Sequence, residues 1–230
     1  MTFASSIARA TCLLFALACC LAVAAQDLTR IQAEFSIKEK GTDGTASLTL
    51  GTVYYDKVLK KAVYRVRFPE PEVIVIQGAN MYRVAEGKPT EHALAGELAE
   101  HSVFHLALSG HLPHFGLKGS AYTMSDMERD EDMVITTWEP PATKGAERGS
   151  VVLSQVDKRL HGLVSYKPGN KELAGKQLFR KYTAVGSVQF PTEVLQILYF
   201  DQGERTKLTT YKNIELNGTD DSWYDYAVPD

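Results

Sequence analysis

The sequence predicts a mainly β protein of the α+β type, with one or two helices and about eleven antiparallel strands in one strongly curved sheet or unclosed barrel. After Thr29, apolar and polar residues alternate with a period near two, which is typical of strands with one buried face. The connections between these runs are short and rich in Gly, Asp and Asn. Such short connections favour antiparallel hairpins and exclude βαβ units.

The predicted strands follow this alternation in order along the chain. At Tyr64, Val66 and Phe68, for example, two aromatic rings and a valine point one way while the arginines between them point the other way. The runs are residues 32–38, 48–56, 63–68, 72–77, 80–85, 133–138, 151–156, 162–167, 177–185, 192–200 and 207–216.

Residues 92–111 break the period of two and predict a helix instead. Its apolar stripe continues around much of the helix, so we expect the helix to cover the concave face of the sheet. Gly110 and Pro113 supply stop signals at its C-terminal end. The stripe is formed by Leu94, Leu98, His101, His105 and Leu108, and is widened by Val103, Phe104 and Ala107.

Residues 1–25 predict a secretory signal peptide, which leaves residues 26–230 as a single β domain. Arg9 is the only charge in the leader, and the apolar run that follows is shorter than the ~20 residues that a membrane-spanning helix needs. An alternative cleavage site would leave the chain attached to a membrane by a lipid on Cys20.

Composition excludes several classes of function. All three cysteines lie in the leader, so the exported domain has neither a disulfide nor thiol chemistry. The formal net charge is −3 with no basic patch, so nucleic acid is not an expected partner. No later segment is long and apolar enough to span a bilayer, and we expect a soluble monomer.

Histidines form the densest group of chemically active side chains. Five of the six lie between His92 and His114, and on a helix His101 and His105 would project from one side, as two zinc ligands do. Ser102 stands where a zinc protease needs a glutamate. We therefore favour histidines that pack along the helix and expect no cofactor, with a metalloprotein using His101 and His105 as an alternative.

The sequence carries no pattern typical of an enzyme. It has no Gly-x-Ser-x-Gly segment for a nucleophilic serine and no Gly-rich phosphate-binding loop. The acidic residues between 126 and 132 predict a solvated turn, because paired acid and base catalysis needs carboxylates in dissimilar, partly buried settings. A non-catalytic protein is expected.

Apolar and aromatic residues recur along nearly the whole predicted sheet. A single curved sheet of about eleven strands has a concave face that one helix cannot fill, and such a half-filled barrel is suited to an apolar ligand. The inward residues predicted to bind this ligand are Phe35, Leu50, Tyr64, Val66, Phe68, Ile74, Ile76 and Phe104.

Several segments, in their order along the chain, resemble the LolA-type periplasmic carriers of outer-membrane lipoproteins. They are the amphipathic strand at 31–37, the glycine-containing strand at 50–55, the hairpin at 73–82, and the closing segments at 190–194, 211–217 and 223–229. The resemblance implies an unclosed antiparallel β-barrel with a helical lid. It also implies a location in the periplasm of a Gram-negative bacterium.

By this resemblance, the protein is a carrier or chaperone for lipid acyl chains of a lipoprotein or another lipidic cargo, with inner- and outer-membrane transport partners. Lys60 lies where carriers of this type keep an arginine that governs ligand release, and lysine lacks the planar fork of arginine. An alternative is an envelope sensor or scaffold that recognises a protein partner through the same sheet. That alternative expects an exposed edge strand.

Overall fold

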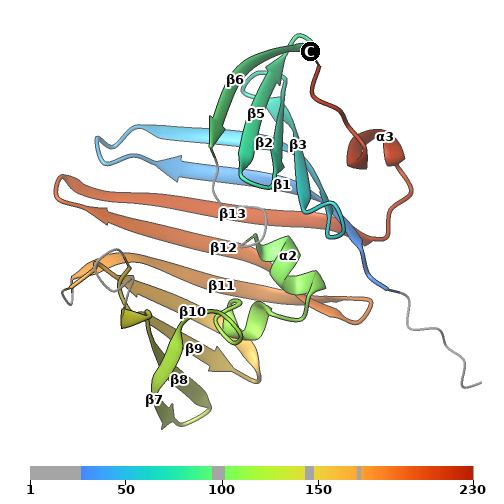
Figure 1. Cartoon of the computed structure of the whole chain (residues 1–230). Coiled ribbons are helices and arrows are strands. Elements are labelled where there is room, and N and C mark those ends of the chain that lie inside the picture. The colour runs from blue at the N-terminus through green and yellow to red at the C-terminus, as the bar shows by residue number, and fades with distance from the viewer. Residues whose placement is uncertain (1–26, 95–101, 143–147, 170–171, 230) are drawn as a thin grey trace, which may run out of the picture.

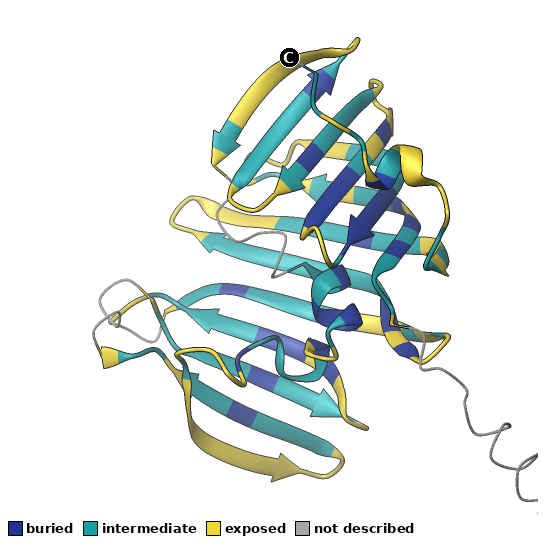
Figure 2. Cartoon of the chain, turned by 45° about the vertical axis from the view of Figure 1, so that its right-hand side comes forward, coloured by how far each residue is buried: buried dark blue, intermediate teal, exposed yellow. Residues whose placement is uncertain are grey.

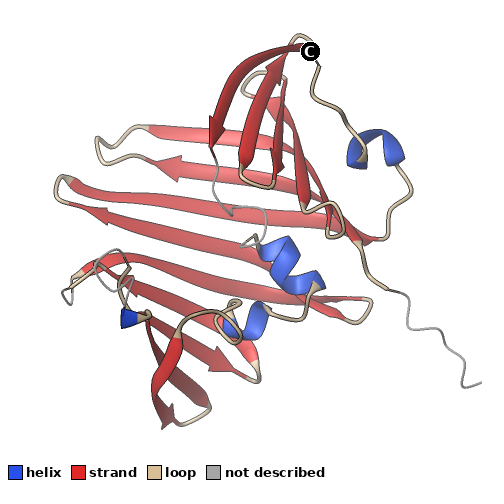
Figure 3. Cartoon of the chain, viewed as in Figure 1, coloured by secondary structure: helices blue, strands red, loops and turns tan. Residues whose placement is uncertain are grey.

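The computed structural model describes residues 27–94, 102–142, 148–169 and 172–229, and these form one antiparallel sheet of 13 strands (Figure 1, Figure 3). The first six strands are β1 (Arg30–Lys40), β2 (Ala46–Asp56), β3 (Lys61–Phe68), β4 (Glu72–Gln77), β5 (Asn80–Ala85) and β6 (Lys88–Leu94). The others are β7 (Thr123–Asp130), β8 (Met133–Glu139), β9 (Val151–Val156), β10 (Arg159–Tyr166), β11 (Leu173–Val185), β12 (Val188–Phe200) and β13 (Gly203–Leu216).

Short helical segments accompany the sheet. Those that lie wholly within the described residues are α2 (Val103–Leu108), the 3-10 helix η1 (Leu112–His114) and α3 (Asp221–Tyr224). Helix α2 packs against β12, η1 packs against β10, and α3 packs against β2 and β3. The ends of the sheet curve toward the side that carries α2, which we call the concave face (Figure 1).

The strand order is β6-β5-β4-β3-β2-β1-β13-β12-β11-β10-β9-β8-β7, so the first and last strands pair at the centre. In this pairing Ile31 lies opposite Leu216, and Phe35 lies opposite Tyr211. A meander of hairpins leads outward from the centre on each side. Strands β6 and β7 lie at opposite edges of the sheet. The predicted fold class, an unclosed antiparallel barrel with little helix, is confirmed.

All the predicted strand runs are strands, and the two additional strands are the edges β6 and β7. Every residue of β7 is exposed, and so are most residues of β6. An edge strand whose two faces are both exposed to solvent needs no apolar residues on either face, because backbone hydrogen bonds alone hold it to the sheet. Its sequence therefore shows no apolar alternation. The prediction of a solvated turn at 126–132 is therefore wrong for the residues that lie in β7.

The predicted helix at 92–111 is also largely wrong. Residues 92–94 belong to β6, residues 95–101 lie outside the described part of the chain, and α2 has only 6 residues. Ser102 caps this helix, since its side chain accepts a hydrogen bond from the backbone N–H of His105 (3.2 Å). Gly110, with a φ of 70°, lies just beyond its end, as the stop signal predicted.

The core is densest where α2 meets the centre of the concave face (Figure 2). Phe104 of α2 is 1% exposed, and its ring centroid lies 5.2 Å from that of Tyr211 and 5.5 Å from that of Phe190. A second, smaller cluster lies on the opposite face of β2–β4, which the C-terminal segment covers. There the ring of Tyr54 stacks on Trp223 at 5.8 Å. Both faces of this half of the sheet are thus covered.

One end of the central pairing is fixed by Arg30. Its Nε donates to Asp56 (2.8 Å), and its guanidinium pairs with Asp221 and lies over the ring of Tyr224 (4.8 Å). These carboxylates raise the pKa of Arg30, chiefly through the hydrogen bond to Asp56. Arg30 therefore ties the first strand, the second strand and the C-terminal helix together.

We expect Arg30→Met to lower the free energy of unfolding by about 3–5 kcal/mol, because Asp56 is buried and would lose its charge partner. Urea denaturation followed by circular dichroism measures this change. The control is Arg180→Met, an exposed arginine on β11, which should change stability by less than about 0.5 kcal/mol. Equal effects of the two substitutions would contradict the role given to Arg30.

Candidate functional site

The concave face carries apolar side chains that remain only partly buried. They come from both halves of the sheet and pack against the main core. The short α2 covers part of this face (Figure 1). The side chains concerned on the strands are Ile37, Tyr64, Ile74, Ile76, Trp138, Val151, Val194 and Tyr211.

Six of the predicted ligand-binding residues share this core. Phe35, Val66 and Phe104 are buried within it. Tyr64, Ile74 and Ile76 are half-buried at its surface. The period of two along β1, β3 and β4 brings them to one face, as predicted. The three half-buried side chains leave part of their apolar surface exposed on the concave face.

The structure does not bring Leu50 and Phe68 into this group. Leu50 lies on the face of β2 opposite to the buried Val53, because β2 pairs with β1 without a break and its residues alternate strictly. Phe68 follows a register shift in β3, where Arg67 is an additional residue, so its side chain leaves the face of Val66. Leu50 lines a pocket on the opposite face of the sheet. Phe68 is 46% exposed at the end of β3.

Lys60, the predicted gating residue, lies in the turn between β2 and β3 with a φ of 48°. The neighbouring Lys61 is the buried lysine, and its Nζ donates to the backbone carbonyl of Tyr226 (2.7 Å). Burial lowers the pKa of Lys61. Lys61 thus anchors the C-terminal segment, and the gating role of Lys60 stays a prediction.

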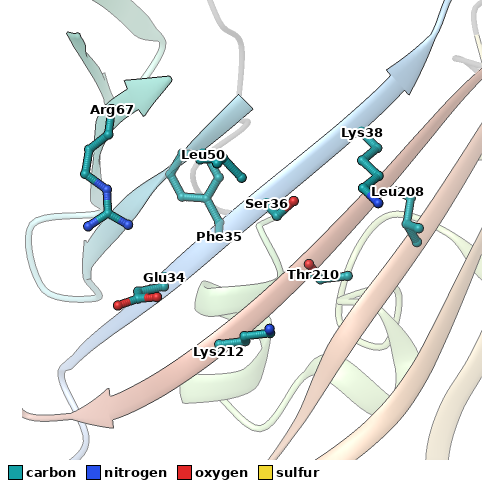
Figure 4. A pocket seen from close by; sticks show the side chains of 9 residues that line it. All are labelled: Glu34, Phe35, Ser36, Lys38, Leu50, Arg67, Leu208, Thr210 and Lys212. Carbon is teal, nitrogen blue, oxygen red and sulfur yellow. The ribbon is translucent and has the colours of Figure 1, made fainter. Parts of the chain in front are cut away.

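A pocket of about 440 Å³ lies on the face opposite α2, where β13, β1, β2 and β3 run side by side (Figure 4). We call it the outer-face pocket. It is lined by Glu34, Phe35, Ser36, Lys38, Leu50, Arg67, Leu208, Thr210 and Lys212.

A second pocket, of about 520 Å³, opens between the α2–η1 segment and two hairpin turns. We call it the helix pocket, and its volume lies in the range typical of small-molecule sites. Its apolar lining residues include Leu28, Leu108, Leu112, Leu160, Tyr182 and Val188. The Tyr182 hydroxyl donates to the carbonyl of Leu160 (2.7 Å), which fixes one wall. Sequence patterns did not indicate this pocket, because its walls come from turns far apart in the chain.

Both ring nitrogens of His105 are already in contact with hydroxyl groups of the protein. Its Nδ1 lies 2.6 Å from the Tyr55 hydroxyl, and its Nε2 lies 3.3 Å from Oγ of Ser109. His101 lies outside the described residues. Among the residues that are described, no three side chains of metal-ligand type are grouped as a metal ion would require.

The described part of the chain also has no helix of the length and apolarity needed to cross a membrane.

Comparison with known proteins gives similarity at the level of structure. No family model matches the sequence, and no curated protein matches it significantly. Among solved structures, a LolA superfamily protein from Nitrosomonas europaea has a TM-score of 0.59 at 13% identity, covering 87% of this chain and 92% of its own. The chain therefore has the LolA-like fold.

Two further solved structures agree. A candidate outer membrane lipoprotein-sorting protein domain from Vibrio parahaemolyticus has a TM-score of 0.59 at 9% identity, covering 86% of this chain and 90% of its own. A DUF1329 family protein from Desulfovibrio piger has a TM-score of 0.60 at 10% identity, covering 87% of this chain and 91% of its own. At these identities the likeness establishes the fold, and function must be argued from the site.

The tyrosines of the concave face give a pH prediction. Burial raises the pKa of Tyr64 to about 12 and raises that of Tyr211 well above its usual value of 10.0. The folded protein then holds protons that the unfolded chain releases above about pH 10, so stability is complete below pH 10 and falls as the pH rises toward 12. We expect the free energy of unfolding in urea to decrease between pH 10 and 12. The decrease should be smaller in Tyr64→Phe/Tyr211→Phe, and an unchanged slope in this variant would refute the assignment.

Proposed function

We propose that this protein is a non-catalytic carrier or chaperone that binds the acyl chains of a lipid or a lipidated protein on the concave face of its open sheet. The observation that carries the proposal is the set of half-buried apolar side chains, from both halves of the sheet, that pack against the same core on the concave face. A hydrocarbon chain needs no polar partner, and its burial stabilises the complex by about 0.8 kcal/mol per methylene.

The helix pocket extends this surface toward one end of α2. Its lining combines leucines at 108, 112 and 160 with polar residues of the turns, such as Asp157, Lys158 and Gln189. This combination suits an amphiphile, whose chain would lie against the leucines and whose head would lie near the polar residues. Phe104 of α2, which is fully buried against the sheet, would support the ligand surface from below.

The proposal includes an export route and a location. The predicted signal peptide at 1–25 would deliver the domain to the periplasm of a Gram-negative bacterium, where acyl chains crossing between membranes need shielding from water. The likeness to a lipoprotein-sorting domain supports this location and suggests membrane transport proteins as partners. The cargo would be a lipoprotein or another lipid with the same kind of chain.

A protein partner is the second candidate, and the exposed edges favour it. All residues of β7 are exposed, and Met124 and Met127 there are 47% and 63% exposed. An unpaired strand edge can add a strand from another chain. In that case, a partner would be recovered with the protein, and its binding would be lost when a proline replaces Met127.

The carrier proposal is tested by substitutions on opposite faces of β12. Val194 faces the core, and Ile197, three residues further on, faces away from it by strand alternation. We expect the delipidated domain to bind a fluorescent fatty acid saturably. Val194→Asp and Ile76→Asp should each weaken binding by about tenfold or more, because a carboxylate would lie against the hydrocarbon chain. Ile197→Asp should leave the affinity unchanged.

Fluorescence titration gives the affinities, and circular dichroism shows whether each variant is folded. Absence of saturable binding by the unsubstituted domain would refute the proposal. Equal losses in Val194→Asp and Ile197→Asp would place the probe elsewhere than on the concave face. Native mass spectrometry of protein purified from its own periplasm would identify the lipid.

A further inference from the structure

The outer-face pocket lies on the side of the sheet that the carrier proposal does not use. Phe35 of β1 and Tyr211 of β13 pair with each other and face the core. Because strand residues alternate between faces, the side chains beside them point to the outer face. These include Ser36 and Thr210, which lie opposite each other on β1 and β13. The pocket therefore sits back to back with the core under α2.

Two irregularities in strand pairing shape this pocket. Between Gln32 and Glu34, β1 changes register against β13, and Asn213 of β13 has a φ of 49°. On the other side, β2 pairs Leu50 with Phe68 and Gly51 with Val66, which leaves Arg67 as the additional residue of a bulge. A bulge bends its strand and redirects a side chain. Figure 4 shows the Arg67 guanidinium extending down beside Glu34 and the ring of Phe35.

The charges of the pocket favour an anion. Lys38, Arg67 and Lys212 contribute three cationic groups to the lining, against the one carboxylate of Glu34. None of the three cations forms an ion pair within the described part of the chain. The hydroxyls of Ser36 and Thr210 add hydrogen-bond donors between them (Figure 4). A carboxylate or phosphate group would satisfy these donors and balance the charge.

An apolar row leads away from the pocket across the outer face. Leu208 of β13 lies opposite Leu195 of β12, which lies opposite Leu178 of β11. All three are half-buried, and none belongs to either core cluster of the described residues. With strands about 4.8 Å apart, the row extends about 10 Å from Leu208. Inside the pocket, Leu50 and Leu208 provide apolar contacts beside the hydroxyls.

We propose that the outer-face pocket is a second binding site, specific for a single-chain anionic amphiphile. The carboxylate or phosphate head lies among Arg67, Lys38 and Lys212, and the alkyl chain lies against Leu208 and along the leucine row. Three unpaired cations select the head, and the row of leucines accepts the chain. The pocket volume of about 440 Å³ suits one molecule taken from solution. This site is separate from the concave face, so it does not depend on the carrier proposal.

The test uses isothermal titration calorimetry on the domain without its leader, with dodecyl phosphate below its micellar concentration. We expect R67Q/K212Q to weaken one class of dodecyl phosphate sites by about tenfold or more, since two charge-assisted contacts to the head are lost. The binding should also weaken as salt is added. The matched control is R205Q/K207Q, which removes two cations from the opposite face of β13 and should leave the affinity unchanged.

Three other ligands define the outcomes. Dodecyl maltoside, with the same chain and no charge, should bind at least tenfold more weakly to this site, and equal binding would overturn the proposal. Inorganic phosphate bound as tightly as dodecyl phosphate would show an anion site without a role for the chain, which also overturns it. Binding only to vesicles of anionic phospholipid, and not to dodecyl phosphate, would indicate a membrane surface instead.

Leu195→Asp tests the chain separately from the head. It places a carboxylate on the leucine row, so it should weaken dodecyl phosphate and leave inorganic phosphate unaffected. Val194 precedes Leu195 and faces the concave side. Val194→Asp should therefore leave dodecyl phosphate binding at the outer-face pocket, the binding that R67Q/K212Q weakens, unchanged. Failure of the carrier proposal would appear as fatty-acid binding that Val194→Asp leaves unchanged and R67Q/K212Q removes. Failure of the outer site would appear as the reverse.

Discussion

The pairing of β1 with β13 is the contact on which the rest of the structure depends. In the described sheet it is the one place where the N-terminal and C-terminal meanders pair, because every other strand pairs with a neighbour in the sequence. The hydrogen bond from the backbone N–H of Arg30 to Asn217 joins residues 187 positions apart. Such a long closure carries a large entropic cost. The side chains of Arg30 and Asn217, together with the paired strands, offset it, and only then do the two halves share one concave face.

A continuous sheet of this size has more apolar surface than the helices of the described residues can cover. Helix α2 has 6 residues and α3 has 4, and each covers a limited area on its own face. The side chains beyond these areas are half-buried, among them Ile76 on one face and Leu195 on the other. Soluble proteins seldom leave large apolar patches exposed without a use for them. The incomplete cover is therefore the physical basis of both binding sites proposed above.

The sequence predicts those parts of the fold in which one face is buried and the other is wet. That condition holds along most of the strands from β1 to β5 and from β8 to β13, and their alternation is visible in the residues. Where the C-terminal segment covers the second face of β2–β4, apolar residues occupy both faces and still predict strands. It fails for β6 and β7, where both faces are wet and backbone pairing alone determines the strand. It also fails for the 92–111 segment, where a helical spacing of apolar residues spans the end of β6 and the start of α2.

The same reasoning explains which site residues could be predicted. Tyr64, Ile74 and Ile76 follow strict alternation and reach the concave face together. Phe68 follows a bulge, and the additional residue Arg67 reverses the face that alternation assigns to it. Leu50 alternates regularly with the buried Val53, so the pattern of β2 itself assigns it to the outer face and the prediction for Leu50 is wrong. The helix pocket could not be predicted at all, because Leu112 and Val188 meet only after the sheet has curved. The apolar alternation along a strand therefore predicts which face of the sheet a side chain lies on. The positions of pockets depend in addition on bulges and on the curvature of the sheet, which alternation does not show.

The two faces of the central strands are chemically independent although they share one backbone. Tyr211 faces the core under α2, while the adjacent Thr210 and Lys212 face the outer pocket. A substitution at one of these positions changes the chemistry of one face and leaves the side chains of the other in place. This independence would let one thin sheet hold an apolar cargo on its concave side and an anionic amphiphile on its outer side, as the two proposals require. Each proposed site could then be removed by substitution without disturbing the other, provided that the pairing of β1 with β13 is kept.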